Sequence, residues 1–563
     1  MIILSLTNHN ESSASLHDTK KKITYAASEE RFTRIKNSSG MPLKTIDFLL
    51  KKRKISINKV DQFVYCSHES ILPTKQIQKD LEKEKNTLNE YDKQVFEKRI
   101  KAEIKFNKKY IDNFNKWIKK NKVSKNKISF MDHHEAHARS AIICQKKSKG
   151  FIITADGKGG FTSSAIWKFD KKKITCVSRN STFNSLGYLY GNVTIGLGYK
   201  AERHEGKITG LSSYGKIQKK ISFNKVFSVI GKKIFARNLK QNFIPFFLRG
   251  KNYWDVSQFT KDIKKYPSKD VAATVQNLLE KILVKYVKKN IPKNSNLLLA
   301  GGIFANVKLN RKIKEINLNR YLYVAPPMSD MGLCLGGIHK LSKKNLIIDN
   351  MYLGPKTNND KIIKELKKDK KIGFKMFENK ESLYKIITNK LLKNQIIGIF
   401  NGSMEFGPRA LCNRSIIFTA KKKKLNDIVN KRLNRTEFMP FAPVCMDKFS
   451  SRSFEKIKKW DYLSKFMTVT YKCKKYFLQN YPAACHVDRT ARPQILYKKD
   501  NPWFYNFLQS YYNFTGQTCV MNTSFNNHEE PIVCYPRDAI KSLQNKNVDC
   551  IIFNGKILVF KNK

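Results

Sequence analysis

The stretch "DVAATVQNLLEKILVKYVKK" at residues 270–289, which runs into "NLLLAGGIFAN" at residues 296–306, decides the fold class of this 563-residue chain. Apolar residues recur at helical spacing in the first segment and predict an amphipathic helix. The second segment opens with an uninterrupted apolar run and closes on a glycine pair, which is typical of a buried strand and a tight turn. A helix that leads into a buried strand predicts an α/β protein.

Segments with strand character precede this unit, and helix–strand alternation follows it. The expected strands on the N-terminal side are "IILSLT" (2–7), "ITYAA" (23–27), "QFVYCS" (62–67), "KISFMD" (127–132), "GFIITADG" (150–157) and "SSAIWKF" (163–169). On the C-terminal side we expect helices at 360–368 and 380–394 and strands at 371–377 and 396–402, with a last apolar segment at 550–560.

A domain boundary is indicated near the middle of the chain. The polar run "LSKKNLIIDNMYLGPK" at residues 341–356 closes on Gly354 and Pro355, which is typical of a connection between domains. We therefore expect one α/β domain at residues 1–345 and a second at residues 346–563.

The chain is strongly basic, with 109 Lys and Arg against 45 Asp and Glu and a formal net charge of +64. A polyanion partner such as RNA, DNA or a membrane surface would explain this excess. However, the lysines are spread over the whole length, whereas a nucleic-acid surface concentrates its charge. Lys, Asn and Ile are all abundant and all have A/T-rich codons, so codon bias is the better explanation and we do not expect a nucleic-acid partner.

The cysteines and the N-terminus bear on the cellular compartment. The 11 cysteines are scattered singly without a CxxC pair, which argues against a disulfide framework or a zinc knuckle. Reduced thiols in a cytosol are the default for such a chain, so we expect a cytoplasmic protein. The start "MIILSLTNHNESS" lacks the basic region of a signal peptide, and no apolar stretch is long enough for a membrane span.

The stretch "MDHHEAHARSAI" at residues 131–142 contains three of the ten histidines. On a helix, His133 and His137 share one face a turn apart, which is the spacing at which two imidazoles hold one metal ion. An exposed helix start is the alternative. Asp156, at the end of an expected strand, and Asp330, in a loop, would complete a nitrogen and oxygen site suited to iron, manganese or zinc. Each aspartate is also typical of a turn or a helix N-cap.

Glycine-rich loops and arginines suggest binding of anionic ligands. "DGKGG" (156–160) and "AGGIFAN" (300–306) each follow a strand, which allows close approach of a nucleotide or simply a tight turn. In the second domain Arg409, Arg414 and Arg492 occur in expected loops, and "MNTSFNN" at residues 521–527 is a small polar segment bounded by strand-like residues. Arginines from several loops suit a bidentate phosphate or carboxylate ligand, and surface ion pairs are the alternative.

Together these motifs resemble the NodU/CmcH family of O-carbamoyltransferases from the first strand to the last. The stretches that carry the resemblance include "SEERFTRIK" (28–36), "DHHEAHARSA" (132–141), "ADGKGG" (155–160), "EGKITGLSSYG" (205–215), "LAGGIFANVKLN" (299–310), "SDMGLCLGG" (329–337), "EFGPRALCNRS" (405–415), "TARPQ" (490–494) and "NTSFNNHEEPIVCYPRDAI" (522–540). Each stretch is weak alone, whereas the whole set in family order is highly specific.

The resemblance implies a fold and two half-reactions. The first domain would have the duplicated actin-like, sugar-kinase fold of the tRNA threonylcarbamoyl-transfer proteins, and the second would resemble the threonylcarbamoyl-adenylate synthases. By similarity, the second domain would join carbamoyl phosphate and ATP into carbamoyl-adenylate. The first domain would transfer the carbamoyl group to a hydroxyl of a small-molecule or glycan acceptor in a biosynthetic pathway.

The resemblance also implies roles for residues. The family's metal ligands fall on His133, His137, Asp156 and Asp330, and the implied metal is Fe(II) or another divalent ion that acts as a Lewis acid. Lys36 matches a position near the carbamoyl-adenylate, so Lys36, His133 and His137 are the expected catalytic residues. The residues implied to line the nucleotide are Gly157, Gly301, Gly302 and Asn306. Those implied to hold carbamoyl phosphate are Arg409, Arg492, Asn522 and Ser524.

Four positions depart from the family pattern. The family segment "KxRExFRPFAP" is "LNRTEFMPFAP" here, so Leu433 and Met439 replace a Lys and an Arg expected to contact carbamoyl phosphate in relatives. Cys412 replaces a usual Gly, and Gly160 replaces a usual Glu. The candidate substitutes for the missing cations are Lys431, Arg432 and Arg435.

These departures leave two alternatives to a complete enzyme. One is a degenerate protein that lacks the first half-reaction, and the other, motivated by the charge, is an RNA-binding threonylcarbamoyl-transfer relative. The sequence does not identify the acceptor, and an oligomer is compatible with it.

Overall fold

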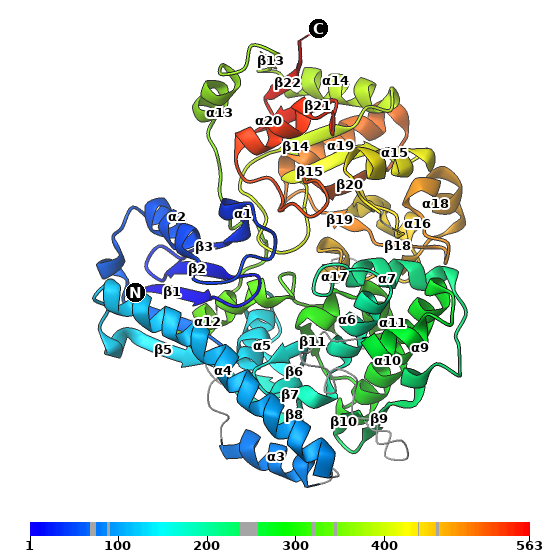
Figure 1. Ribbon diagram of the computed structural model, residues 1–563. Helices are drawn as coiled ribbons and strands as arrows, with labels where there is room; N and C mark the ends of the chain where they lie inside the picture. Colours follow the sequence, from blue (N-terminus) through cyan, green and yellow to red (C-terminus); the bar gives the residue numbers. More distant parts are fainter. Residues whose placement is uncertain are drawn as a thin grey trace. The chain divides into compact units, whose positions relative to one another are not determined.

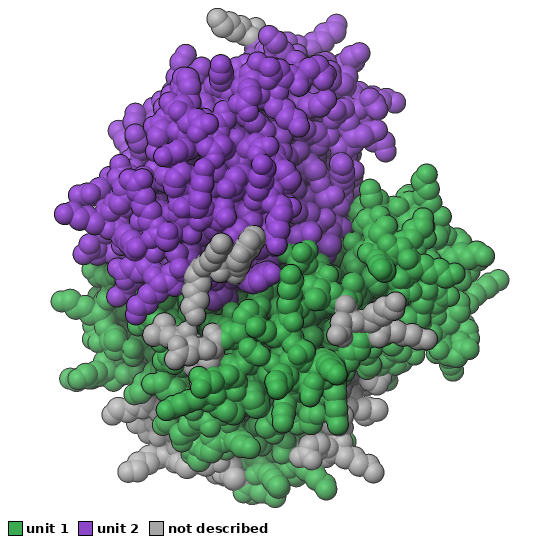
Figure 2. All heavy atoms as spheres, turned by 180° about the vertical axis from the view of Figure 1, so that it is seen from behind, with its two compact units in different colours: residues 1–26, 39–349 green, residues 27–38, 350–563 purple. Residues whose placement is uncertain are grey.

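The computed structural model describes residues 1–67, 75–86, 90–236, 257–316, 321–342, 346–436, 438–457 and 461–562. The chain forms two compact units, which Figure 2 shows in different colours. The first contains residues 1–26 and 39–349, and the second contains residues 27–38 and 350–563. The sequence predicts the division after residue 345 and does not separate residues 27–38 from the first domain.

One sheet of the first unit contains the N-terminal strand of the chain (Figure 1). Its strand order is β3-β2-β1-β4-β5, in which β1 pairs antiparallel with β2 and parallel with β4, and β4 pairs parallel with β5. The bounds are β1 (Ile2–Thr7), β2 (Ser13–Asp18), β3 (Ile23–Ser28), β4 (Gln62–Cys66) and β5 (Ile128–Met131). The strands β1, β3, β4 and β5 were expected from the sequence, whereas β2 was not.

The second sheet of this unit repeats the same topology. Its order, read from one edge, is β8-β7-β6-β11-β12, with an antiparallel meander of β6, β7 and β8 and parallel pairing of β6 with β11 and β11 with β12. The bounds are β6 (Lys149–Gly159), β7 (Thr162–Asp170), β8 (Lys173–Ser181), β11 (Leu297–Ala300) and β12 (Leu322–Val324). The first unit therefore contains one strand topology twice, as the duplicated actin-like fold requires.

Two helices, α5 (His133–Ile143) and α12 (Leu333–Leu341), lie close together in the first unit. A Cβ atom added at Gly336 would lie 2.1 Å from the carbonyl oxygen of Ala136 in α5, and one at Gly337 would lie 2.1 Å from Ser5 Oγ in β1. Side chains at these two glycines would overlap their neighbours, which explains the glycine pair in "LCLGG" by close packing. α5 also packs on β6 and β11, so it links the two repeats.

The remaining elements of the first unit surround these two sheets. They are α2 (Leu43–Arg53), α3 (Lys75–Lys85), α4 (Glu90–Lys120), α6 (Leu186–Gly196), α7 (Glu205–Leu211), β9 (Phe227–Ile230), β10 (Lys233–Ala236), α9 (Ser257–Ile263), α10 (Ser268–Asn290) and α11 (Val307–Ile316). The helix α10 covers the stretch that decided the fold class, and it is followed by β11 as expected. The long helix α4 was not among the expected elements.

The second unit is built on one mixed sheet with the order β13-β22-β21-β14-β15-β20-β16-β19. Its strands are β13 (Ile372–Met376), β14 (Ile397–Phe400), β15 (Arg414–Thr419), β16 (Ala442–Met446), β19 (Gln494–Leu496), β20 (Cys519–Ser524), β21 (Cys550–Phe553) and β22 (Ile557–Lys561). A short separate ladder joins β17 (Tyr471–Lys472) to β18 (Thr490–Ala491). The resemblance of this domain to threonylcarbamoyl-adenylate synthases stays a prediction.

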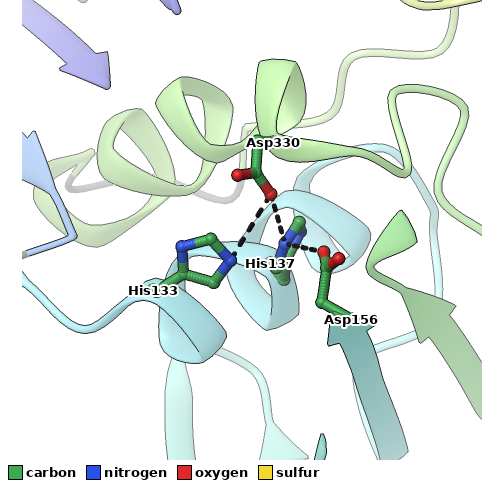
Figure 3. A group of neighbouring side chains, drawn as sticks. All are labelled: His133, His137, Asp156 and Asp330. Carbon is green, nitrogen blue, oxygen red and sulfur yellow. Dashed lines mark ion pairs between the residues drawn. The ribbon is translucent and has the colours of Figure 1, made fainter. Parts of the chain in front are cut away.

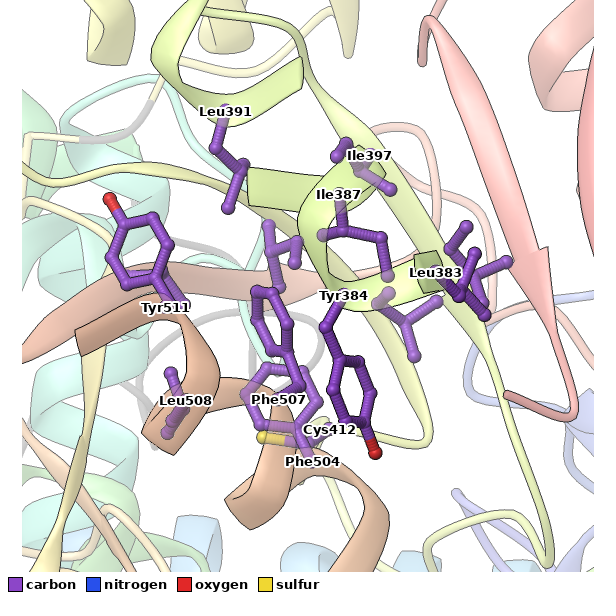
Figure 4. Packing of buried hydrophobic residues seen from close by; sticks show 14 of the residues in the cluster. Leu383, Tyr384, Ile387, Leu391, Ile397, Cys412, Phe504, Phe507, Leu508 and Tyr511 are labelled. Atoms are coloured by element: carbon purple, nitrogen blue, oxygen red, sulfur yellow. The ribbon is translucent and has the colours of Figure 1, made fainter. Parts of the chain in front are cut away.

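The helices of the second unit are α1 (Glu30–Thr33), α13 (Asn359–Leu366), α14 (Lys380–Leu392), α15 (Lys424–Arg432), α16 (Ser450–Ser453), α17 (Tyr462–Lys465), α18 (Lys475–Asn480), α19 (Pro502–Thr515) and α20 (Pro536–Gln544). The core of the unit forms where α14 and α19 pack against the sheet, with Leu383, Ile387, Phe504 and Phe507 fully buried (Figure 4). Among the described residues, no helix is both long enough and apolar enough to cross a membrane.

Candidate functional site

The start of α5 positions the two histidines of the expected metal site. Asp132 caps the helix, because its Oδ1 accepts a hydrogen bond of 2.6 Å from the Glu135 N–H. Arg179 Nη1 lies 3.1 Å from the other carboxylate oxygen of Asp132. His133 and His137 follow one turn apart on the same side of the helix, and both are buried (Figure 3). The alternative of an exposed helix start is therefore wrong.

Asp156 from the carboxyl-terminal part of β6 and Asp330 from the loop before α12 meet these histidines. His137 Nε2 lies 3.1 Å from Asp156 Oδ2 and 3.4 Å from Asp330 Oδ1, and His133 Nε2 lies 3.4 Å from Asp330 Oδ1. One ligand atom from each of the four residues can be chosen so that all lie within 4.8 Å of one another. The structure thus brings together the four residues singled out from the sequence.

These separations fit a metal ion. Ligand atoms about 2.1 Å from a metal, at angles of about 90–110°, lie roughly 3.0–3.4 Å from one another. In the described part of the chain, His133 Nε2 and both ring nitrogens of His137 are buried and make no hydrogen bond of acceptable geometry. A buried polar atom without a hydrogen-bond partner destabilises the folded protein unless a ligand binds to it. The side chains of Asp156 and Asp330 are 18% and 21% exposed, so the group is reached from the carboxylate side.

The electrostatics of the group favour a cation. Burial opposes a charge on His137, but its interactions with Asp156 and Asp330 outweigh burial and raise its pKa to about 9. Burial and the neighbouring Asp156 raise the pKa of Asp330 to about 7. Although burial opposes it, the contact with His137 holds the pKa of Asp156 below its usual range. His137 and Asp330 therefore bind protons near neutral pH, and a metal ion would displace these protons.

Residues around the group fix its geometry. Backbone N–H groups of Gly157 and Gly302 donate to Asp156 Oδ1 at 2.7 Å and Oδ2 at 2.9 Å, which orients the carboxylate. Ser67 Oγ lies 3.5 Å from His133 Nδ1. His134 is fully buried, with Nδ1 2.9 Å from Thr154 Oγ1 and Nε2 2.9 Å from the Thr162 carbonyl. His134 is thus held by the surrounding chain and is not one of the four residues of the group.

The residues implied to line a nucleotide have contacts within the protein. Gly301 adopts φ +104°, and a Cβ atom there would lie 2.2 Å from the carbonyl oxygen of Ala155, so close packing alone requires glycine. The amide of Asn306 pairs reciprocally with that of Gln276, at 2.8 and 3.1 Å, and accepts from the Leu309 N–H. These contacts give structural roles to both positions, and nucleotide binding there stays a prediction.

The sequence did not single out His9 and Glu202, which interact electrostatically with the group, or Lys158, which interacts with both of them. His9 follows β1, stacks on Tyr110 with 4.4 Å between ring centroids, and influences His133. Burial, together with Lys158, lowers the pKa of His9 to about 3. Burial raises the pKa of Glu202, which lies near Asp156 and Asp330. Polar residues directly after the first buried strand were the signal that could have drawn attention to His9.

In the second unit, three segments with predicted ligand-binding residues converge at Asn522 in β20. Its Nδ2 donates to the Ala410 carbonyl at 3.3 Å and to Gln494 Oε1 at 2.8 Å. Ala410 is next to Arg409, and Gln494 is two residues from Arg492. The loops that carry both arginines therefore reach the same strand as Asn522.

Arg435 contacts the end of β20 and the segment that follows this strand. It donates to Thr523 Oγ1 at 2.7 Å, to Ser524 Oγ at 3.2 Å and to Asn526 Oδ1 at 2.9 Å. Lys36 belongs to the same unit, and its pKa is lowered by burial and by the nearby charge of Arg435, against the opposing effect of Glu30 and Glu529. Lys36 and Arg435 thus place two positive charges near one another, and Arg435 lies against the small polar residue Ser524.

The other arginine of the Gly-Pro loop has a structural role. Arg414 is fully buried, stacks on Phe400 with 3.6 Å between guanidinium carbon and ring centroid, and donates to the carbonyls of Asn401 and Asn413. Glu405 supports the same loop by accepting from three backbone N–H groups, those of Leu411, Asn413 and Arg414. Arg414 therefore holds the loop that presents Arg409.

Two of the departures from the family pattern have visible consequences. Leu433 is fully buried, and its carbonyl accepts from the His528 N–H at 2.9 Å. Cys412 adopts φ +78°, a conformation that costs a residue with a side chain about 1 kcal/mol and that glycine adopts freely, which fits the Gly of the family pattern. The Cys412 thiol lies 3.3 Å from Gln494 Oε1.

Comparison with known proteins now places the chain. A family model described as "Carbamoyltransferase N-terminus" matches residues 3–338, and one described as "Carbamoyltransferase C-terminus" matches residues 388–561. The chain belongs to the carbamoyltransferase family. Carbamoyltransferases are transferases, and this assignment confirms the resemblance seen in the sequence.

Relatives in this family cover the full chain. An uncharacterized protein of Methanocaldococcus jannaschii is 32% identical over 100% of both chains. The nodulation protein NolNO of Sinorhizobium fredii is 25% identical over 95% of this chain and 77% of its own. Among solved structures, the activator of 2-hydroxyisocaproyl-CoA dehydratase from Clostridium difficile aligns with a TM-score of 0.33 and 10% identity over 60% of this chain and 93% of that one, too distant a likeness to carry an argument.

Proposed function

We propose that this carbamoyltransferase is an ATP-dependent O-carbamoyltransferase with two half-reactions. In the first, carbamoyl phosphate, ATP and water give carbamoyl-adenylate, phosphate and pyrophosphate. In the second, the carbamoyl group passes to a hydroxyl of a small-molecule or glycan acceptor, and AMP leaves. The observation that carries the proposal is the convergence of His133, His137, Asp156 and Asp330 in a member of this family.

We assign the first half-reaction to the second unit. Its cations suit a doubly charged phosphate, because guanidinium groups bind phosphate oxygens in pairs. Arg409 and Arg492 would contact carbamoyl phosphate from their loops, and Asn522 and Ser524 would contact it from β20. Arg435, which matches the Arg at the third position of the family segment, contacts Ser524 and would supply positive charge where Leu433 and Met439 do not. Lys36 would stabilise the negative charge of the adenylate.

We assign the second half-reaction to the first unit. His133, His137, Asp156 and Asp330 would hold Fe(II) or another divalent ion, which when bound supplies Lewis acidity toward an oxygen. Gly157 and Gly302 keep the Asp156 carboxylate in place through their N–H groups. His9 and Glu202 lie around the same group and are the residues we assign to acceptor positioning. The cytoplasm is the expected compartment.

A degenerate protein without the first half-reaction is the second candidate, and the buried Leu433 favours it. One experiment separates the two. Purified, metal-loaded protein is incubated with ATP, and pyrophosphate is measured with and without carbamoyl phosphate. The proposal predicts release that requires carbamoyl phosphate and that survives His137→Ala. Absence of pyrophosphate from the wild-type protein would favour the degenerate alternative.

A further inference from the structure

Two cysteines of the second unit lie in contact although twelve positions separate them in the sequence. The Sγ atoms of Cys473 and Cys485 are 3.8 Å apart. Cys473 directly follows β17, and Cys485 follows the short helical turn Pro482–Ala484. A disulfide bond has an S–S distance of about 2.05 Å, so closure requires an approach of about 1.8 Å, which is within the reach of side-chain rotation.

The backbone around the two thiols is anchored on both sides. The Cys473 N–H donates to the Arg489 carbonyl at 2.9 Å, and the His486 N–H donates to the Thr490 carbonyl at 2.8 Å. β17 and β18 pair through Tyr471 with Ala491. The two cysteines are thus held beside one short ladder, and this ladder leads directly into the loop of Arg492.

The two thiols differ in a way that suits stepwise oxidation. Cys485 is partly exposed, whereas Cys473 is buried with 5% exposure. The contact with Cys473 lowers the pKa of Cys485, against the effect of burial, while the same contact, followed by burial, raises the pKa of Cys473. A partly exposed thiol with a lowered pKa next to a buried thiol is the arrangement of an attacking and a resolving cysteine.

We propose that Cys473 and Cys485 form a dithiol that a low-molecular-weight disulfide such as oxidised glutathione converts into an intramolecular disulfide. The Cys485 thiolate attacks the reagent, forms a mixed disulfide and releases one glutathione thiolate. The Cys473 thiol then loses its proton and attacks Cys485 Sγ, which releases the second glutathione. Two protein thiols are oxidised and one glutathione disulfide is reduced to two thiols, so atoms and electrons balance.

Two further cysteines near this pair serve as internal controls for the oxidation of thiols. Cys445 and Cys519 are directly opposite each other in the antiparallel ladder of β16 and β20, and both are fully buried. A reagent in solution does not reach them, so they should stay reduced in the folded protein. Cys176 of the first unit is partly exposed, and 3.8 Å from its Sγ lies the Ser178 carbonyl rather than a second thiol.

The experiment exposes the full-length native protein to oxidised glutathione and maps disulfides by mass spectrometry after alkylation and digestion. We expect a Cys473–Cys485 cross-link with a loss of 2 Da, and a glutathione adduct of 305 Da that persists on Cys485 only in Cys473→Ser. Cys176→Ser is the matched control and should leave the cross-link unchanged. The bridge closes a short loop, so the melting temperature should rise by roughly 5–10 °C on oxidation and return with dithiothreitol.

Three results would overturn the proposal. One is a cross-link between Cys445 and Cys519 in place of the expected pair. Another is a stable glutathione adduct on Cys485 in the wild-type protein without closure. The third is protection of both thiols from alkylation by one bound Zn²⁺ under reducing conditions, which would make the pair part of a metal site. The test does not depend on enzymatic activity, so it stands or falls separately from the proposed function.

Discussion

The replacement Gly159→Ala tests the geometry of the His/Asp group without removing any of its four residues. A Cβ atom at position 159 would lie 2.3 Å from His133 Cδ2 and 2.8 Å from His134 Cδ2. Ordinary contacts are about 3.4 Å or longer, so the His133 ring would have to move by about 1.1 Å. Metal–ligand distances tolerate only about 0.2 Å. Because Gly159 does not have a positive φ, an alanine there strains the ring contacts and not the backbone.

We expect the dissociation constant for a divalent ion to rise at least about 10- to 100-fold, the range seen when supporting residues of metal sites are changed. Isothermal titration calorimetry with Co²⁺ or Fe²⁺ under anaerobic conditions measures it. Gly206→Ala is the control, because nothing lies within 4 Å of a Cβ atom there, and its affinity should match the wild type. A well-folded Gly159→Ala protein with unchanged affinity would refute the assignment of His133 as a ligand.

Three further predictions follow from charge and burial. Metal affinity should rise with pH, because the ion displaces protons from His137, with a pKa of about 9, and from Asp330, with a pKa of about 7. In metal titrations the dissociation constant should fall about tenfold per pH unit from pH 7 to 9, and more steeply with pH below pH 7. A dissociation constant that does not change with pH would contradict this prediction. Arg435→Met should lower carbamoyl-phosphate-dependent pyrophosphate release by about 100-fold or more, whereas Arg432→Met should change it less than about twofold. Equal effects of the two replacements in the same assay would contradict a role of Arg435 in binding carbamoyl phosphate. Leu433→Lys, which restores the residue of the family pattern, should lower the free energy of unfolding in urea by about 3 kcal/mol or more, because it buries an ammonium group. An unchanged urea midpoint would show that the introduced lysine side chain reaches solvent.

Local patterns in the sequence were sufficient for much of the fold. The helix at 270–289 and the strands after it follow from apolar periodicity, and the shared face of His133 and His137 follows from helical spacing. The helix α4 was overlooked although it carries apolar residues at helical spacing, as in Ile111, Phe114 and Ile118. The local signal for this helix is therefore present in the sequence.

Other features depend on contacts that no local pattern records. Residues 27–38, with Lys36, belong to the second unit because of packing between segments hundreds of positions apart. The same holds for Arg435, whose contacts to Ser524 and Asn526 span about ninety residues. Two of the glycines implied to line a nucleotide, Gly157 and Gly302, also donate N–H groups to Asp156, and the contact of Gly302 depends on how β6 and β11 pair. Long-range pairing of this kind decides the site and is visible only in the structure.

The most direct test of the account is mass-spectrometric detection of carbamoyl-adenylate after incubation of the purified protein with ATP and isotope-labelled carbamoyl phosphate. The account predicts that the wild-type protein and His137→Ala both form the labelled adenylate, while Arg435→Met does not. Labelled adenylate from the wild-type protein but not from folded His137→Ala would contradict the division of the two half-reactions between the two units, and its absence from both proteins would contradict the first half-reaction itself.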